Sequence, residues 1–151
     1  MRINLTLNDK AVKQKLSLIE RGLSSPKEPL KNTETELMEY FSETIFNRQG
    51  SSKPWKPLAP STMLARGKGW GYYKNKPEQR GKTLVWTGKL RKSFKSTLGR
   101  FKLTISNTAS YFRKHQLGED GTPKRLILNT DKPVEDIVLK NFERFFNKIM
   151  K

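Results

Sequence analysis

The stretch from Ser51 to Thr83 constrains the fold most, because it interrupts two regions of regular apolar spacing. Four prolines and four glycines fall within it and remove the helical periodicity. They are Pro54, Pro57, Pro60, Pro77, Gly67, Gly69, Gly71 and Gly81. A loop of this length without its own core is uncommon in a compact domain and is usually functional or mobile. We therefore predict an extended arm at about 51–83, with at most a short helical turn started by Ser61 or Thr62.

The residues before this arm predict a short strand and two amphipathic helices. Apolar Ile3, Leu5 and Leu7 alternate with polar residues, as in a half-buried edge strand. Two runs with helical spacing follow, separated by a break at 24–26. After an N-cap at Asn8 or Asp9, the first run comprises Val12, Leu16, Ile19 and Leu23, and the second comprises Leu30, Leu37, Met38, Phe41 and Ile45. Gly50 is the expected stop of the second helix.

The residues after the arm predict a small sheet and a final helix. A strand at 84–86 leads into a short helix that Thr87 caps and that runs to Ser93. A hairpin follows, with strands at 95–98 and 101–106 around Gly99-Arg100. We then expect a helix at 109–117 ending at Gly118, a turn at 119–123 and a last strand at 125–128. The last helix starts near Asp131 and carries the apolar residues Val134, Val138, Phe142, Phe145 and Ile149.

These elements predict a single α+β domain over residues 1–151. It has N-terminal helices, a small mostly antiparallel sheet with a hairpin, the long basic arm and a C-terminal amphipathic helix. Splitting 151 residues into two domains would leave each half too small to bury enough apolar surface. Hydrophobic residues make up 34%, and the ten glycines raise this to roughly 41%, which is below the globular norm. Contacts between subunits could complete so lean a core.

The net charge of +17 favours anionic partners and repels other copies of the chain. The sequence has no cysteine, which suits a reducing cytoplasm. No apolar run approaches the roughly 18 residues of a membrane span, and the N-terminus alternates instead of forming the apolar block of a signal peptide. We therefore expect a protein made and used in the cytosol, with no membrane partner.

The residues offer little for catalysis. There is no cysteine nucleophile, and His115 is the one imidazole available as a base. We expect it to be a hydrogen-bonded structural group. The carboxylate pairs Glu119-Asp120 and Glu135-Asp136 suit capping and solubility, and no cluster has the ligands of a zinc site. The glycine-rich stretch 67–71 lacks the spacing of a phosphate loop. We therefore predict a protein that is not an enzyme and has no cofactor or metal.

Positive charge is concentrated between Gly50 and Arg100, where thirteen Lys or Arg residues accompany one acid, Glu78. Aromatic residues lie among these cations, including Trp55, Trp70, Tyr72 and Tyr73. Such a mixture can contact phosphates and stack on bases, which makes sequence-independent DNA binding one alternative. Candidate DNA contacts are Lys68, Lys74, Lys76, Arg80 and Lys82. Aromatic and arginine residues are also enriched in protein interfaces, and we favour protein contact for this segment.

Three separated segments resemble the phage virion morphogenesis family, the tail completion or head-tail joining proteins of tailed bacteriophages. The segment at 55–62 is similar to a Trp-x-Pro-Leu-x-x-x-Thr motif, and 84–93 to Leu-x-x-Thr-Gly-x-Leu-x-x-Ser. The segment at 111–118 is similar to Tyr-x-x-x-His-Gln-x-Gly and is followed by Pro123-Lys124-Arg125. The chain departs from the family at 125–129, where Arg-Leu-Ile-Leu-Asn replaces Arg-Pro-Phe-Leu-Gly, and in a lysine-rich insertion around 67–82.

The resemblance implies a structural protein of the virion neck, which assembles in the host cytoplasm and acts as a ring of identical subunits, a hexamer being one candidate size. The implied partners are the tail terminator or tail tube, the head-completion or connector proteins, and genomic DNA in the lumen. Within the motifs, Thr87 and Gly88 are expected to form a strand-to-helix turn with Leu90 buried and Arg91 exposed. Trp55, Pro57 and Leu58 would anchor the arm, Arg91 and the aromatics Trp70, Tyr72 and Tyr73 would meet protein, and Tyr111, His115, Gly118 and Arg125 would be structural.

Overall fold

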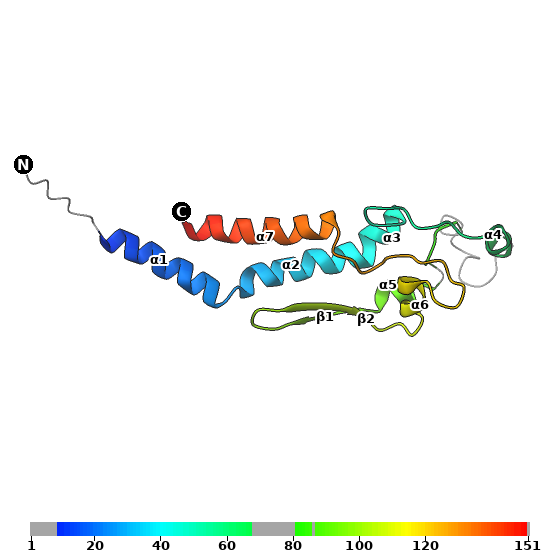
Figure 1. Cartoon of the computed structure of the whole chain (residues 1–151), viewed down its shortest axis with the longest axis horizontal. Coiled ribbons are helices and arrows are strands. Elements are labelled where there is room, and N and C mark those ends of the chain that lie inside the picture. Colours follow the sequence, from blue (N-terminus) through cyan, green and yellow to red (C-terminus); the bar gives the residue numbers. More distant parts are fainter. Residues whose placement is uncertain (1–8, 68–80, 86, 151) are drawn as a thin grey trace, which may run out of the picture.

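Helix α2 (Lys27–Glu39) lies at the centre of the computed structural model, with α7 (Lys132–Met150) along one side and a hairpin along the other (Figure 1). The hairpin strands, β1 (Phe94–Leu98) and β2 (Leu103–Asn107), form a two-stranded antiparallel sheet. The predicted α+β class is confirmed. The structure describes residues 9–67, 81–85 and 87–150. Outside the described residues lie the predicted strand at 3–7, Trp86, and the part of the arm that carries Lys68, Trp70, Tyr72, Tyr73, Lys74, Lys76 and Arg80.

Helix α1 (Asp9–Ser24) forms where the apolar spacing predicted it and ends at the predicted break. Its last turns approach the C-terminal end of α7 closely at Gly22, where a Cβ would lie 2.7 Å from the Cδ1 atom of Ile149 and would displace that side chain. The rest of α1 projects away from the body of the molecule (Figure 1). Leu16 and Leu23 on this helix keep 59% and 57% of their surface exposed. Two of the four predicted apolar residues are therefore exposed in the described structure, while Ile19 is half-buried.

The second predicted helix continues from α2 through a π-helical turn, η1 (Tyr40–Thr44), into α3 (Ile45–Arg48). A π turn adds a residue per turn, so it brings positions five apart onto the same face of the helix. Tyr40 and Phe41 in this way share the buried face with Ile45 and Phe46. The predicted stop at Gly50 was wrong by one residue, because Gln49 takes the left-handed conformation, with φ 58°.

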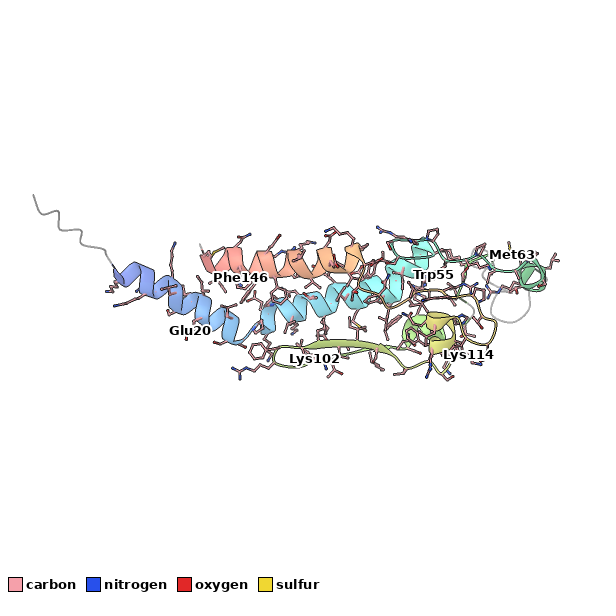
Figure 2. All side chains as sticks on the ribbon, in the orientation of Figure 1. Glu20, Trp55, Met63, Lys102, Lys114 and Phe146 are labelled. Carbon is pink, nitrogen blue, oxygen red and sulfur yellow. The ribbon has the colours of Figure 1, made fainter. Side chains whose placement is uncertain are left out.

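The core is built around Phe46, Ile45, Leu90 and Ile127, all of them almost fully buried. Trp55 joins this core from the arm: its ring packs edge-on against Phe46 with centroids 5.4 Å apart. The indole Nε1 donates a hydrogen bond of 2.8 Å to the carbonyl of Leu126. Figure 2 places Trp55 at the junction between the helices and the long connections. Trp55, near the start of the predicted arm, therefore belongs to the core. An arm that is free of the core would have to begin after this residue and not at Ser51.

Three predicted elements differ from the structure. Leu84 adopts a left-handed conformation with φ 63°, which no strand contains, so the predicted strand at 84–86 is wrong for its described residues. Residues 125–128 form no ladder with another described strand, so the last predicted strand is also wrong. The arm contains a full helix, α4 (Pro60–Gly67), in place of at most a short turn. Pro60 suits the first position of that helix, where no intrahelical N–H bond is needed.

The remaining elements follow the prediction with shifted ends. The hairpin aligns Leu98 with Leu103, so its loop has four residues instead of the predicted Gly99-Arg100 pair. The short helices are α5 (Lys89–Lys92) and α6 (Phe112–Leu117). At the start of α7 the carbonyl of Asp131 accepts a hydrogen bond of 2.9 Å from the N–H of Val134.

Ser51 ties the beginning of the arm to two helices. Its hydroxyl donates to a carboxylate oxygen of Asp131 at 2.5 Å and also shares a hydrogen bond with the hydroxyl of Tyr40. The N–H of Ser52 donates to the same carboxylate oxygen at 2.9 Å. Burial alone would raise the pKa of Asp131, but hydrogen bonds from Ser51, Ser52 and Asn129 hold this pKa below its usual value. The charged carboxylate therefore joins the arm to the start of α7.

We expect Phe46→Ala to lower the free energy of unfolding by about 3–5 kcal/mol, because it empties a fully buried ring site. The matched change Phe101→Ala removes a ring that is 59% exposed in the hairpin loop, and should cost less than about 1 kcal/mol. Urea denaturation of both variants measures the difference. A Phe46→Ala variant as stable as Phe101→Ala would contradict the position of the core.

Candidate functional site

Residues from all three family-like segments line one cavity of about 410 Å³, which we call the three-segment pocket. The segments contribute Leu58, Leu84, Thr87, Gly88, Lys89, Leu90, Tyr111 and His115. Three polar residues outside the segments complete the lining: Arg66, Thr83 and Arg125. Sequence positions more than fifty residues apart thus meet in space, which no local pattern could indicate.

Arg125 is the most deeply buried charge at this pocket, with 5% of its surface exposed. Its Nε donates to the carbonyl of Lys56 at 3.1 Å. Its two terminal nitrogens donate to the carbonyls of Pro123 and Pro57, each at 3.4 Å. Burial lowers the pKa of Arg125, and the positive charge of nearby Arg66 acts in the same direction. The guanidinium therefore clamps the first segment onto the turn that follows the third.

Arg66 plays a similar role at the end of α4. It is 6% exposed, and one terminal nitrogen donates to the carbonyl of Lys82 at 2.8 Å. This hydrogen bond connects the end of α4 to residues 81–85, the next described segment of the chain. Lys82 itself is half-buried, and of the five predicted DNA contacts it alone lies in the described part of the chain.

The side-chain amide of Gln116 replaces a neighbouring strand for residues 127–128. Its Oε1 accepts hydrogen bonds from the N–H groups of Ile127 and Leu128 at 2.8 and 3.1 Å. Its Nε2 donates to the carbonyl of Leu128 at 2.5 Å. The backbone N–H of Arg125 is satisfied separately by the carbonyl of His115 at 2.7 Å. No role was predicted for Gln116, although it is part of the motif at 111–118. Its place in that motif was the available signal that its side chain has a structural role.

Gln49 holds a second irregular connection in the same way. Its Nε2 donates to the carbonyls of Phe46 and Thr83 at 2.6 and 3.4 Å, and its Oε1 accepts a hydrogen bond from the N–H of Thr83. Thr83 is buried beside the pocket as a result. The role of Gln49 could not be predicted from the sequence, because nothing in a helix-terminal glutamine indicates a partner more than thirty residues away.

His115 is half-buried at the pocket and packs edge-on against Tyr111, with ring centroids 6.1 Å apart. Burial, followed by the charge of Arg125, lowers the pKa of His115, so the ring is neutral near pH 7. Its Nδ1 atom is buried and has no hydrogen-bond partner among the described residues. The packing against Tyr111 fits the predicted structural role, but the hydrogen bond expected with that role is not made by Nδ1.

Two glycines in the motifs have physical reasons for their identity. Gly88 precedes α5 with φ 72°, a left-handed conformation that a side chain would strain. Gly118 ends α6 with φ 80°, and a Cβ there would lie 2.9 Å from the Cβ of Lys124. The predicted N-cap at Thr87 is wrong, because Gly88 takes that position, although the Thr87 hydroxyl still accepts a hydrogen bond of 3.3 Å from the N–H of Lys89.

The predicted exposure of Arg91 is wrong, although Leu90 is buried as predicted. The Arg91 side chain is 21% exposed, and its Nε donates to the carbonyl of Ser42 at 2.9 Å. It also pairs with the carboxylate of Glu43. Both partners lie in the π-helical turn, where the changed hydrogen-bond pattern leaves carbonyls available. Arg91 therefore connects α5 to the π-helical turn of the same chain.

The remaining predicted site residues have mixed positions. Trp55 is buried, Pro57 is exposed and Leu58 is half-buried at the pocket. Glu119 pairs with Arg113 at 3.0 Å, and Asp120 pairs with Lys114 at 2.7 Å, both at the surface.

Within the described ranges, no set of three or more His, Cys, Asp or Glu residues is placed to hold a metal ion. None of the described helices is long and apolar enough to cross a membrane. No protein-family model matches the chain, and no match was found among curated proteins or solved structures.

We expect Gln116→Met to lower the free energy of unfolding by about 2–4 kcal/mol, because it leaves the backbone N–H groups of Ile127 and Leu128 without an acceptor. The same change at exposed Gln14 on α1 should cost less than about 0.5 kcal/mol. Thermal and urea unfolding compare the pair. Equal stability of the two variants would show that Gln116 does not support residues 127–128.

Proposed function

We propose that the chain is a non-enzymatic structural protein of the neck of a tailed bacteriophage, where it completes the tail or joins it to the head as a homo-oligomeric ring. The proposal is supported by the resemblance of segments 55–62, 84–93 and 111–118 to the virion morphogenesis family, and by their meeting at one pocket. Its partners would be the tail terminator or tail tube and the head-completion or connector proteins. It would assemble in the host cytoplasm and reside in the virion.

The observation that carries the assembly role is the uncovered apolar surface of α1. Leu16 and Leu23 are exposed and seven residues apart, so they share one face of a helix that projects from the body (Figure 1). Leu18 is also exposed, on another side of the helix. Exposed leucines that share a helix face are typical of interaction sites. A head-to-tail contact, in which α1 of one copy packs against a different surface of the next, closes into a ring when the rotation between copies allows it.

The net charge of +17 opposes such association between copies. Salt screens charge repulsion over about 10 Å at 0.1 M and leaves apolar contacts intact. Self-association through α1 should therefore strengthen as salt is added. DNA binding by the same cations would weaken, so salt separates the two functions.

We expect light scattering to detect oligomers of the purified chain, alone or with tail or connector proteins, and more of them at 0.5 M than at about 0.05 M salt. Leu16→Gln combined with Leu23→Gln should raise the dissociation constant at least about tenfold, because each leucine loses apolar contact. Leu139→Gln, at a similarly exposed leucine on α7, is the matched control and should have little effect. Monomers under every condition would refute the assembly role, and unchanged association of the double variant would refute the part of α1.

The alternative is a sequence-independent DNA-binding protein. It is favoured by exposed cations on α5 and the hairpin: Lys92, Lys95, Arg100 and Lys102. Figure 2 places Lys102 on the hairpin, on its far side from α7. Lys92 lies on α5 and Lys95 on β1, while Arg100 and Lys102 lie in the hairpin loop.

If the alternative holds, the logarithm of the duplex affinity should fall linearly with the logarithm of salt concentration. Lys95→Gln with Lys102→Gln should make this slope shallower by about two, and Lys10→Gln with Lys15→Gln on α1 should leave it unchanged. Fluorescence anisotropy with a labelled duplex measures both slopes. Weak binding already at low salt would remove this alternative.

A further inference from the structure

A groove of about 490 Å³ is lined by α2, α7 and the hairpin, and we call it the hairpin groove. Its lining on α2 runs from Leu30 to Phe41, and α7 adds Val138. Leu103 and Ile105 of β2 also line it and are half-buried. Neither α4 nor residues 81–85, which flank 68–80, contributes to this lining. Apolar surface from three elements is therefore only partly covered within the described chain.

The outer edge of β2, which borders this groove, is open. Two backbone hydrogen bonds mark the ends of the hairpin ladder, from Gly99 to Lys102 at 2.7 Å and from Thr108 to Ser93 at 2.9 Å. In an antiparallel pair, residues that bond to the partner strand alternate with residues whose N–H and C=O groups point away from it. The two bonds fix this alternation, so Leu103 and Ile105 direct their backbone groups away from β1. These outward groups have no backbone partner among the described residues.

An added strand suits this edge better than a helix does. A strand beside Leu103 and Ile105 would bond to their outward groups and place alternate side chains in the groove. A helix would leave those groups unbonded, because its own N–H and C=O groups are bonded internally. The other face of the hairpin is polar, with exposed Lys95, Thr97, Thr104 and Ser106. The site therefore selects a strand that is apolar on one face and polar on the other.

Residues 2–7 of the sequence have this alternation. Their apolar positions are Ile3, Leu5 and Leu7, and their polar positions are Arg2, Asn4 and Thr6. As a strand, residues 3–7 would span about 13 Å. The groove side of α2 from Leu30 to Phe41 spans about 17 Å, so the segment fits its length.

The segment cannot reach the hairpin groove of its own chain. Helix α1 begins at Asp9 and has 16 residues, so it is about 24 Å long. Figure 1 places its start at the end of the molecule, beyond the hairpin. Leu7 is two residues from Asp9 and so lies at most about 7 Å from it. A second copy must therefore supply the strand.

We infer that residues 2–7 of one copy add a strand to the outer edge of β2 in the next copy, with Ile3, Leu5 and Leu7 in its hairpin groove. The inference rests on the proposed assembly of copies and names the contact between them. The donated segment and the receiving edge are different surfaces, so the contact is head-to-tail and can repeat around a ring. Because α1 follows the strand directly, its exposed leucines would also lie near the receiving copy.

Introduced cysteines test the pairing, because the chain has none of its own. Asn4→Cys or Thr6→Cys labels the polar face of the donated strand, and Thr104→Cys labels the same face of β2. Neighbouring strands lie about 4.8 Å apart, within the roughly 7 Å between Cα atoms that a disulfide can span, whereas β1 would lie about twice as far away. Thr97→Cys is the matched control, because Thr97 is exposed and faces Thr104 on β1.

Under mild oxidation, either donor chain mixed with the Thr104→Cys chain should form mixed disulfide dimers at least about tenfold faster than with the Thr97→Cys chain. Mass spectrometry identifies the mixed dimer. Oligomers that cross-link equally at both positions, or at neither, would overturn this inference and leave the assembly role standing. Monomers under every condition would refute both.

The alternation of the segment gives a second test by light scattering. Ile3→Gln combined with Leu5→Gln should raise the dissociation constant of the oligomers at least about tenfold, because two side chains lose the groove. Asn4→Gln combined with Thr6→Gln alters the other face and should change it less than about twofold. Equal effects of the two double variants would overturn the inference, since the pairing requires one face of the segment and not the other.

Discussion

The fold depends on side chains that hydrogen-bond to irregular backbone. Arg125 binds the carbonyls of 56, 57 and 123, Gln116 binds residues 127–128, and Gln49 binds Thr83. The only described sheet is a hairpin at the edge of α2, so these connections have no strand ladder to satisfy their polar groups. Buried N–H and C=O groups without partners would each cost about 1–3 kcal/mol. The three side chains remove that cost and let Ile127 and Val85 enter the core beside Phe46.

The same solution produces the pocket. Arg125 is buried together with its charge, and the backbone carbonyls that it binds offset part of this charge through their dipoles. Burial, followed by the charge of Arg125, lowers the pKa of His115. The arginine that joins the segments thus also favours the neutral form of the neighbouring imidazole.

Periodic elements could be predicted from the sequence and irregular ones could not. Helices α1, α2 and α7 and the hairpin repeat a local pattern, and each lies close to its predicted range. The apolar residues at 84–85 and 125–128 have the same composition as strands, but their conformation is set by contacts from Gln49 and Gln116, which are distant in sequence. Within the candidate site, Leu90 could be placed in the core from its motif. The bonds of Arg91 could not, because they depend on a π-helical turn that carries no local signal.

The exposed leucines of α1 and the three-segment pocket lie toward opposite ends of the long axis of the molecule (Figure 1). The exposed leucines of α1 lie at one end, and α4, α5 and α6, which surround the three-segment pocket, lie toward the other (Figure 1). Acidic residues of α2 are largely engaged at the helical end: Glu28 pairs with Lys148 at 2.9 Å, and Glu36 with Lys140 at 3.7 Å. These ion pairs connect α7 to α2 across the interface between the two helices. Because α7 packs along α2 and only the last turns of α1 approach it, the leucines in the middle of α1 stay exposed for the contact between copies that we propose.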